Sequence, residues 1–303
     1  MTKPTASIDL GTNSARLLIV HRGCDDSINP ILLKRHITRL GGGFSRGKGI
    51  STEAAERSIV ALRDFADEIW RHGVSRVKAV ATSAVRDAVN GTIFCERVFR
   101  ETGIRLEIIN GEQEALYTLR GVLGNIDDKT GDFLVFDVGG GSTEYTLSHG
   151  DEPLFTQSLP LGVVRLTEGK VTCEAMNEKI CRELALLKGK IKRLGFLEDI
   201  AKATLVGTAG TATTLAAINL EMTDYDYRRV NNHILSLAEI EDIYATLLPL
   251  SPAERLKIKG LEKGREDLII AGALITINTM KSFGFSRLKV SDFGLLEGLL
   301  LAD

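Results

Sequence analysis

Cysteine is scarce in this sequence of 303 residues, and no two cysteines have the CxxC spacing of a metal or redox site. The four that occur are Cys24, Cys95, Cys173 and Cys181. A chain of this length does not need disulfide bonds to support a small core, so a disulfide-stapled secreted domain is excluded. We expect four free, reduced thiols.

Neither sign of charge dominates the composition. The chain has 38 Lys and Arg residues against 40 Asp and Glu residues, which gives a net charge of −2 at pH 7. This balance excludes the class of proteins that coat nucleic acid through bulk positive charge, and it leaves only local basic patches open. We expect no nucleic-acid partner.

The sequence has no stretch with the pattern of a membrane span or of a signal segment. The longest apolar stretch, 268–277, is broken by Gly272 and is far shorter than the roughly 20 residues needed to cross a bilayer. Residues 1–5 leave no room for a charged region and an apolar segment ahead of the strand-like 6–9. We therefore expect a cytoplasmic protein with no membrane partner, and a core helix at 268–277.

The composition that remains is that of an ordinary globular protein. Hydrophobic residues make up 44% of the chain and charged residues 26%. At this length, two domains of roughly 150 residues each are expected.

Strand and helix patterns alternate along the whole chain. Residues 6–20 are typical of a hairpin around a turn at 9–14, and Ser51 opens a helix that runs to about His72. A glycine-rich loop is expected at 41–49. The other expected strands are 32–40, 77–81, 105–109, 133–136, 145–147, 203–206 and 288–291. One further helix is expected to end near 102. The other expected helices span 111–123, 174–194, 212–218, 237–247 and 266–283, and a last one follows 292. This alternation predicts an α/β fold.

The opening hairpin has a second copy further along the chain. Asp9 and Asp137 each end an apolar strand and each precede a turn of the form x-Gly-[Thr/Gly]-x-Ser. Their separation is 137 − 9 = 128 residues, about the length of one domain. The polar segment 124–131 between the copies has the composition of a domain boundary or hinge. Two copies of one unit are therefore predicted.

The two turns have the residue types that bind phosphate. Phosphate needs N–H donors that approach closely, and glycine lacks the Cβ that would hold the backbone away. The turns are Gly11, Thr12, Asn13 and Ser14, and Gly139, Gly140, Gly141 and Ser142. One such turn is weak evidence, because tight hairpins need glycine in any case, whereas a pair favours a binding role.

Carboxylates accompany both turns. Asp9, Asp137 and Glu144 are candidates for a phosphate-bound Mg²⁺ or another divalent cation, which typically takes one or two carboxylates and keeps several waters. The competing interpretation is that each aspartate caps its own turn, and the residues alone leave the two readings open.

A third glycine turn, 207–211, follows an apolar strand and opens a helix. In this geometry the helix amides point at an anion. Thr208, Gly210 and Thr211 are the candidate phosphate-binding residues, because the two hydroxyls add donors beside the amides. Glycine placed there for packing alone is the alternative.

Taken together, these segments resemble the exopolyphosphatase / guanosine pentaphosphate phosphatase (Ppx/GppA) family. The resemblance covers nearly the whole chain in order, in a short two-domain form without the additional helical domain of longer members. The segments that carry it are 9–14, Thr-Ser-Ala-Val-Arg at 82–86, Asn-Gly-Glu-Gln-Glu-Ala at 110–115, 137–144, 159–167, 207–211, Arg-Glu-Asp at 265–267, and 290–298.

The resemblance implies two ribonuclease-H-like domains of the actin-like ATPase superfamily around a central cleft. We expect the first domain to comprise 1–125 with a C-terminal helix at about 293–303, and the second to comprise 126–292. The internal repeat is independent support for this expectation.

The resemblance also implies roles for single residues. Glu114 would position and deprotonate the attacking water, Arg86 and Arg165 would bind phosphate, and the acidic residues of the second turn would serve the metal. Taken without the motif, Glu114 would be an exposed helix residue and Arg86 a surface ion-pair partner of Asp87 or Glu112. His233 could line the cleft, but a lone histidine is more often structural, and a structural role is expected.

The implied activity is Mg²⁺-dependent release of terminal orthophosphate from inorganic polyphosphate. Hydrolysis of guanosine pentaphosphate in the stringent response is the alternative, and a homodimer is expected. Two further classes remain. One is a kinase of the same superfamily, and the presence of Glu114 in its motif argues against it. The other is a catalytically silent sensor of guanosine polyphosphates, and the presence of Glu114, Arg86 and Asp137 argues against that. The basic run 255–265 is interpreted either as a track for the anionic chain or as a solvated helix face.

Overall fold

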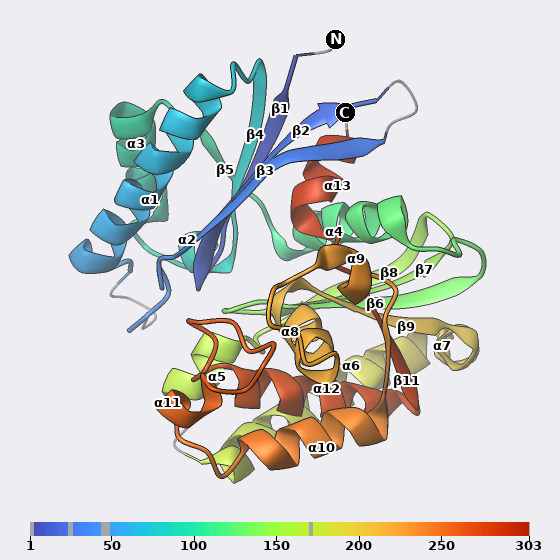
Figure 1. Cartoon of the computed structure of the whole chain (residues 1–303). Helices are drawn as coiled ribbons and strands as arrows, with labels where there is room; N and C mark the ends of the chain where they lie inside the picture. Colours follow the sequence, from blue (N-terminus) through green and yellow to red (C-terminus); the bar gives the residue numbers. More distant parts are fainter. Residues whose placement is uncertain (1–2, 24–26, 44–48, 170–171, 303) are drawn as a thin grey trace. The chain divides into compact units, whose positions relative to one another are not determined.

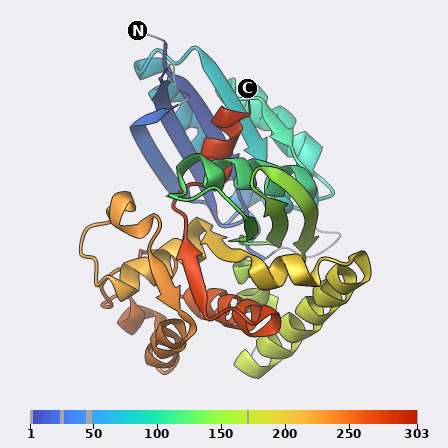
Figure 2. The same cartoon turned by 90° about the vertical axis from the view of Figure 1, so that its right-hand side faces the viewer.

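Two compact α/β units make up the chain (Figures 1 and 2). Unit 1 comprises residues 1–124 and 295–303, and unit 2 comprises residues 125–294. The structure, a computed structural model, describes residues 3–23, 27–43, 49–169 and 172–302. The expectations for Cys24 and for 44–48 of the glycine-rich loop lie outside the described residues.

Unit 1 is built on a five-stranded sheet in the order β3-β2-β1-β4-β5. The first three strands form an antiparallel meander, and β4 and β5 run parallel to β1. The strands are β1 (Thr5–Leu10), β2 (Ser14–Arg22), β3 (Ile28–Ile37), β4 (Arg76–Ala81) and β5 (Leu106–Ile108). The helices are α1 (Thr52–Arg71), α2 (Ser83–Arg86), α3 (Gly91–Thr102), α4 (Gly111–Asn125) and α13 (Leu295–Leu301).

Helices cover both faces of this sheet because side chains of a strand alternate between the faces. Leu17 and Ile19 of β2 pack in the cluster that contains Phe65 of α1. Leu18 and Val20 of the same strand pack instead against α13. The C-terminal helix therefore completes the core of unit 1, where Figure 1 shows it in red beside the blue strands.

Unit 2 is built on a six-stranded sheet in the order β10-β11-β9-β6-β7-β8. Its strands are β6 (Asp132–Val138), β7 (Thr143–His149), β8 (Glu152–Leu159), β9 (Thr204–Thr208), β10 (Ile234–Ser236) and β11 (Arg287–Val290). Its helices are α5 (Val163–Gly169), α6 (Cys173–Leu194), α7 (Leu197–Lys202), α8 (Ala209–Asn219), α9 (Tyr227–Val230), α10 (Leu237–Leu247), α11 (Pro252–Arg255) and α12 (Ile269–Phe283). The apolar α12 lies in the core against α6, α8 and α10, which confirms the predicted core helix.

The two sheets repeat one topology, which confirms the predicted internal repeat. Without β10, the order β8-β7-β6-β9-β11 corresponds strand for strand to β3-β2-β1-β4-β5. In both sheets a three-stranded antiparallel meander precedes strands parallel to its first member. This is the ribonuclease-H-like arrangement that the sequence resemblance implies.

Several local expectations differ from the structure. Strand β3 ends at Ile37 rather than at 40, because the amides of Thr38 and Arg39 bond to the carbonyl of Asn13 instead of continuing the ladder. Asp137 and Glu144 lie in β6 and β7 and pair with each other, so the second turn is tighter than expected. Strand β8 has no counterpart among the expected strands, since it lies at a sheet edge and contains Pro153. None of the helices in the described part of the chain is long and apolar enough to span a membrane.

Candidate active site

Three candidate segments of unit 1 each follow a strand that ends at the same edge of its sheet. They are the first glycine turn, α2 and the start of α4. Leu10 at the end of β1 is in register with Ala81 at the end of β4, and Ala81 is in register with Ile108 at the end of β5. The amide of Thr82 donates to the Leu10 carbonyl (3.2 Å), and the amide of Ile109 donates to the Ala81 carbonyl (3.1 Å). Ligands of α/β sheets bind at the carboxyl ends of parallel strands, so the residues that follow these three ends are the candidates.

Arg86 and Glu114 are in direct contact at this edge. Arg86 Nη1 donates to Glu114 Oε2 (3.2 Å) and to the carbonyl of Ile109 (3.1 Å), whereas Asp87 is farther from the guanidinium at 3.9 Å. The side chains of Arg86 and Glu114 are only 22% and 10% exposed. Glu112, by contrast, is an exposed residue of the same helix turn.

The first turn of α4 presents Glu114 through local capping. The side chain of Asn110 accepts from the Gln113 amide, and the side chain of Gln113 accepts from the Asn110 amide, both at 2.9 Å. These bonds satisfy amides that the helix leaves unpaired at its start. The carboxylate that follows is therefore held in a defined place, where it could accept a proton from a water molecule.

Asp9 is engaged by a cation on the neighbouring strand. Its Oδ2 accepts from Nε (3.1 Å) and from Nη2 (2.7 Å) of Arg16, its direct cross-strand partner. Arg16 was not among the residues predicted for the site. Its signal is the spacing, since Arg16 follows Asp9 by seven residues (16 − 9), as Glu144 follows Asp137 (144 − 137).

The second glycine turn, in unit 2, is braced by the start of α5. The carbonyls of Gly139 and Gly140 accept from the amides of Val163 (3.0 Å), Val164 (2.9 Å) and Arg165 (3.2 Å). A Cβ on Gly162 would lie 2.3 Å from the Gly140 carbonyl oxygen, so only glycine fits there. Among the backbone bonds of the described residues, the amides of Gly140 and Gly141 donate to no carbonyl. Such oriented N–H groups form an anion-binding concavity.

Asp137 and Glu144 face each other across β6 and β7 beside this turn. They are direct cross-strand partners and only 7% and 2% exposed. Glu144 Oε1 accepts from Ser158 Oγ (2.7 Å). Like charges directly opposite each other destabilise a sheet, and a divalent cation would offset that cost. The described residues contain no group of three or more His, Cys, Asp or Glu arranged for a metal. Two carboxylates are a ligand set that fits Mg²⁺, which typically takes one or two of them and keeps several waters.

The third glycine turn connects β9 to α8. Thr208 is in register with Asp137, and its hydroxyl already donates to the Phe293 carbonyl (2.9 Å), so the donor expected there is engaged. Thr211 is 5% exposed and packs against Gly272 of α12. Between them, Ala209 has a left-handed φ of +58°, a conformation that costs a non-glycine residue roughly 1–2 kcal/mol.

Arg265, which belongs to the basic run and to the Arg-Glu-Asp segment, lies over this turn. Its guanidinium atoms are within 1.8–2.1 Å of where a Cβ on Gly210 would be, so only glycine permits this approach. The contact adds a cation to the amides at the start of α8, and nothing in the local sequence beyond the Arg-Glu-Asp segment signals it.

Arg255 and Lys259 of the basic run 255–265 have partners within the protein. Arg255 donates to the carbonyls of Leu247 (2.9 Å) and Glu266 (3.0 Å), and its burial lowers the pKa of the guanidinium. Lys259 is an ion-pair partner of Glu221 at 3.8 Å.

His233 has a structural contact. Its Nε2 lies 2.9 Å from Asn219 Oδ1, and burial lowers the pKa of the imidazole.

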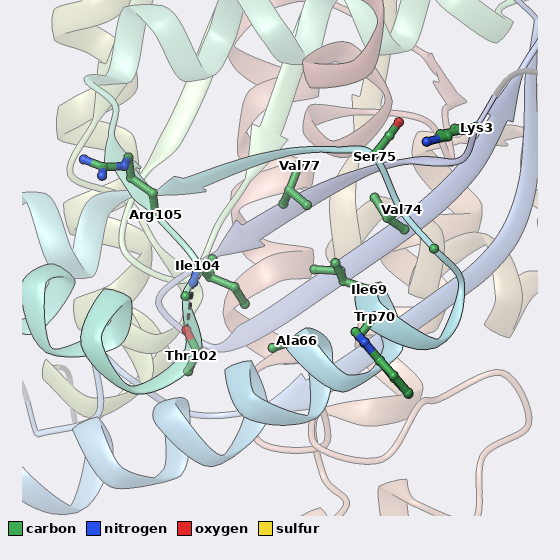
Figure 3. A pocket seen from close by; sticks show the side chains of 12 residues that line it. Lys3, Ala66, Ile69, Trp70, Val74, Ser75, Val77, Thr102, Ile104 and Arg105 are labelled. Carbon is green, nitrogen blue, oxygen red and sulfur yellow. Dashed lines mark hydrogen bonds between the residues drawn. The ribbon is translucent and has the colours of Figure 1, made fainter.

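A cavity of about 550 Å³ in unit 1 has no candidate residue in its lining (Figure 3). It lies where β4 begins, beside the ends of α1 and α3, and Val77, Ile69 and Ile104 make it largely apolar. The candidates fall into two sets: the first turn, Asp9, Arg86 and Glu114 on unit 1, and the other two turns, Asp137, Glu144 and Arg165 on unit 2.

Comparison with known proteins gives matches over almost the whole chain. The family model described as the Ppx/GppA phosphatase family matches residues 19–303. Exopolyphosphatase 2 of Mycobacterium tuberculosis is 31% identical over 98% of this chain and 97% of its own length. The bifunctional 3-dehydroquinate synthase/phosphatase of Fusobacterium nucleatum is 34% identical, and this chain spans only 46% of that protein. The guanosine-5'-triphosphate,3'-diphosphate pyrophosphatase of Aliivibrio fischeri is 28% identical over 99% of this chain and 59% of its own length.

Solved structures agree with these matches. The Aquifex aeolicus PPX-GPPA enzyme superposes with a TM-score of 0.81 at 35% identity, covering 99% of each chain. An exopolyphosphatase from Cytophaga hutchinsonii superposes with a TM-score of 0.90 at 27% identity, covering 99% of this chain and 97% of that one.

Proposed function

Since this chain belongs to the Ppx/GppA phosphatase family, it is a hydrolase of phosphoanhydride bonds, and we propose that it releases terminal orthophosphate from inorganic polyphosphate. The observation that carries the proposal is the contact between Arg86 and Glu114 at the carboxyl edge of the unit 1 sheet. A buried carboxylate held by an arginine is suited to orienting a water molecule for attack on phosphorus.

In the proposed reaction, Glu114 accepts a proton from the attacking water. The water oxygen forms a bond to the terminal phosphorus, and the bond from that phosphorus to the bridging oxygen breaks. The electron pair stays on the bridging oxygen, which becomes the new end of a chain shorter by one phosphate. Arg86 orients the Glu114 carboxylate and offers its remaining N–H groups to the phosphoryl oxygens, so its work is positional and electrostatic.

We assign the phosphate contacts to the backbone of the three glycine turns. The amides of residues 12–14, of residues 140–142 and at the start of α8 have the geometry that suits phosphate oxygens. The amides of Gly11 and Gly139 instead close their turns by donating to the carbonyls of Ser14 and Ser142 (3.0 Å each). The backbone of Arg165 lies beside the second turn, because its amide donates to the carbonyl of Gly140. This position supports the assignment of Arg165 to binding of the phosphate chain.

The proposal includes Mg²⁺ held by Asp137 and Glu144, with Asp9 as a further candidate. When bound, the ion would supply positive charge at the phosphoryl oxygens. Asp9 already accepts two N–H groups from Arg16, so it suits a contact through a water of the ion better than direct ligation. A cytoplasmic location and a homodimer without nucleic-acid or membrane partners complete the proposal. The free thiols of Cys95, Cys173 and Cys181 support a reducing compartment.

Guanosine pentaphosphate is the second candidate substrate. The observation in its favour is the relative from Aliivibrio fischeri, which is 28% identical and is described as acting on guanosine 5'-triphosphate 3'-diphosphate. On this alternative, the same water attack would remove the terminal phosphate of the 5' chain, as a part of the stringent response.

The test is phosphate release by the purified protein from polyphosphate, guanosine pentaphosphate and ATP, each with and without Mg²⁺. Mg²⁺-dependent turnover of polyphosphate, with ATP nearly untouched, is the expected result. Faster turnover of guanosine pentaphosphate would select the second candidate. Binding of guanosine pentaphosphate without release of phosphate from any substrate would reject hydrolysis in favour of a sensor, and transfer of phosphate from ATP to an acceptor would indicate a kinase.

A further inference from the structure

A short segment after β3 braces the first glycine turn of unit 1. The segment comprises residues 38–41, and we call it the strap. The amides of Thr38 and Arg39 donate to the carbonyl of Asn13 (3.0 and 2.9 Å), and the amide of Gly41 donates to the carbonyl of Thr12 (2.9 Å). The strap thus holds two successive peptide planes of the turn.

Hydrogen bonds to the carbonyls of the turn also fix the direction of the amides in the same peptide planes. The peptide group is planar and trans, so the N–H of each plane points away from its C=O. The two planes held by the strap carry the N–H groups of Asn13 and Ser14, which therefore point away from the strap. These are amides that the proposed function assigns to the phosphate chain, and their direction depends on the strap.

The strap does not take this conformation by its own preference. Arg39 has a left-handed φ of +46°, which is unfavourable for any residue with a Cβ. Gly41 lies so close to the turn that a Cβ there would be 2.3 Å from Thr12 Cγ2. A strained segment packed this tightly persists only where its surroundings hold it.

Helix α1 supplies that support. Arg57 Nε donates to the Thr38 carbonyl (3.0 Å), and Arg57 Nη2 makes a weaker contact with the Arg39 carbonyl (3.5 Å). Arg57 therefore fastens the side of the strap that does not face the turn.

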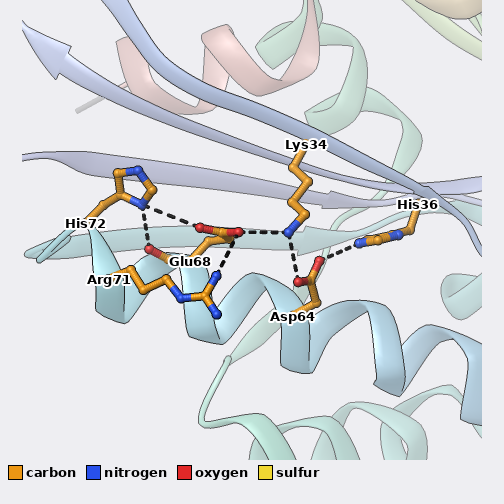
Figure 4. Close-up of polar contacts among 6 residues, drawn as sticks. All are labelled: Lys34, His36, Asp64, Glu68, Arg71 and His72. Atoms are coloured by element: carbon orange, nitrogen blue, oxygen red, sulfur yellow. Dashed lines mark hydrogen bonds and ion pairs between the residues drawn. The ribbon is translucent and has the colours of Figure 1, made fainter.

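The same helix also fastens the strand that leads into the strap (Figure 4). Lys34 Nζ of β3 lies 2.8 Å from both Asp64 Oδ1 and Glu68 Oε1, and His36 Nε2 lies 2.6 Å from Asp64 Oδ2. These contacts end at His36, two residues before the strap, whereas Arg57 of the same helix reaches the strap itself.

We propose that Arg57 is a positioning residue for the first phosphate turn. It acts through the strap: its guanidinium holds the carbonyls of Thr38 and Arg39, and their amides hold the carbonyl of Asn13. The inference rests on the proposed function for the identity of the ligand, and on the contacts above for the linkage.

The first measurement is amide hydrogen exchange of the full chain, compared among wild type, Arg57→Ala and Arg63→Ala. Arg63 is the matched control, because it lies on the same helix and pairs with Glu101 (2.5 Å) rather than with the strap. We expect Arg57→Ala to speed exchange of the Thr38, Arg39 and Gly41 amides by about tenfold or more, and Arg63→Ala to leave them unchanged. Equal exchange in the two variants would overturn the proposal, whether or not the protein hydrolyses polyphosphate.

The second measurement is steady-state hydrolysis of polyphosphate. Misdirected amides weaken binding of the transition state, so Arg57→Ala should lower kcat by about 10- to 50-fold with a smaller change in KM. Its melting temperature should stay close to that of Arg63→Ala. Altered exchange in a protein that hydrolyses no substrate would support the linkage and reject the proposed function.

Arg57→Lys separates positioning from simple attraction of a polyanion. Lysine keeps the charge but has no fork to hold two carbonyls, so only partial recovery of kcat is expected. Full recovery by lysine, together with loss of the alanine defect at about 0.5 M salt, would show that Arg57 acts by charge alone and would overturn the proposal.

Discussion

At the scale of single residues, the candidate site depends on how each charge is matched. Glu114 has Arg86 as its partner and Asp9 has Arg16, whereas Asp137 faces a second carboxylate, Glu144. The two copies of the same hairpin therefore differ in electrostatics. In the first copy a carboxylate faces a guanidinium, whereas in the second copy two carboxylates face each other.

Replacement of Glu114 by glutamine removes the proposed base and keeps the volume and one acceptor for Arg86. We expect kcat for polyphosphate to fall by about 10²-fold or more with little change in melting temperature, because general-base catalysis typically contributes 10²–10⁴-fold. Phosphate release and thermal unfolding provide the measurement. Glu112→Gln is the control, since Glu112 is exposed on the same helix turn. If Glu114→Gln retained activity within threefold of the control, the base would have to lie elsewhere.

Replacement of Asp137 by asparagine tests the metal assignment. Loss of one of two opposed carboxylates should raise the Mg²⁺ concentration at half-maximal activity by about tenfold or more. Mg²⁺ titrations of phosphate release and calorimetric Mg²⁺ binding would measure the shift. Asp132→Asn is the control, because Asp132 lies at the start of the same strand and contacts His149 (2.8 Å). An unchanged Mg²⁺ requirement in Asp137→Asn would remove this residue from the metal site.

At the scale of elements, two strained backbone positions lie just after the ends of strands. Ala209 starts α8 with a φ of +58°, and Arg39 enters the strap with a φ of +46°. Both residues lie directly beside a turn to which we assign phosphate binding. Strain of this kind persists where the surrounding packing determines the backbone, which is typical of ligand-binding turns.

Replacement of Ala209 by glycine should relieve this strain. Relief of about 1–2 kcal/mol is opposed by roughly 0.5–1 kcal/mol of backbone entropy, so we expect the free energy of unfolding to stay equal or rise by up to about 1 kcal/mol. Urea-induced unfolding is the measurement. Ala212→Gly, at an ordinary position of the same helix, should instead lower stability by about 1 kcal/mol or more. A similar loss in both variants would contradict the strain at Ala209.

At the scale of the whole molecule, the chain enters unit 1 twice. Residues 1–124 form its sheet and most of its helices, and the return of the chain adds α13 at residues 295–301. Leu295 and Leu299 of this helix pack with Val80 and Ile109. The core of unit 1 is therefore complete only when the two ends of the sequence meet.

Replacement of Gly298 by alanine should weaken this closure. A Cβ at 298 would lie 1.7 Å from the carbonyl oxygen of Tyr117 in α4, so α13 would have to shift. We expect a loss of about 1–3 kcal/mol, as in other overpacked cores, with a lower melting temperature. Gly189→Ala is the contrasting variant: Gly189 lies in α6 with open space around its Cβ position, and alanine there should stabilise the helix by up to about 1 kcal/mol. Calorimetry would compare the two, and an unchanged melting temperature in Gly298→Ala would show that α13 is not tightly packed.

The sequence by itself determined what depends on neighbours along the chain. Helices such as α1 and α6 begin and end where capping residues predict, with Ser51 at the start of α1 and Gly195 after the end of α6. The glycine turns and the repeated hairpin follow in the same way, because turn chemistry and hydrophobic periodicity act over a few residues. The α/β class and the repeat of one unit could be predicted on that basis.

Only the tertiary structure decided which distant side chains meet. Arg86 and Glu114 are 28 residues apart, and their contact depends on the register of β4 with β5 and on the start of α4. The approach of Arg265 to Gly210 and the anchoring of the strap by Arg57 likewise join segments that share no local pattern. Such contacts arise from strand register and helix packing, which the whole core determines at once, so no short stretch of sequence encodes them.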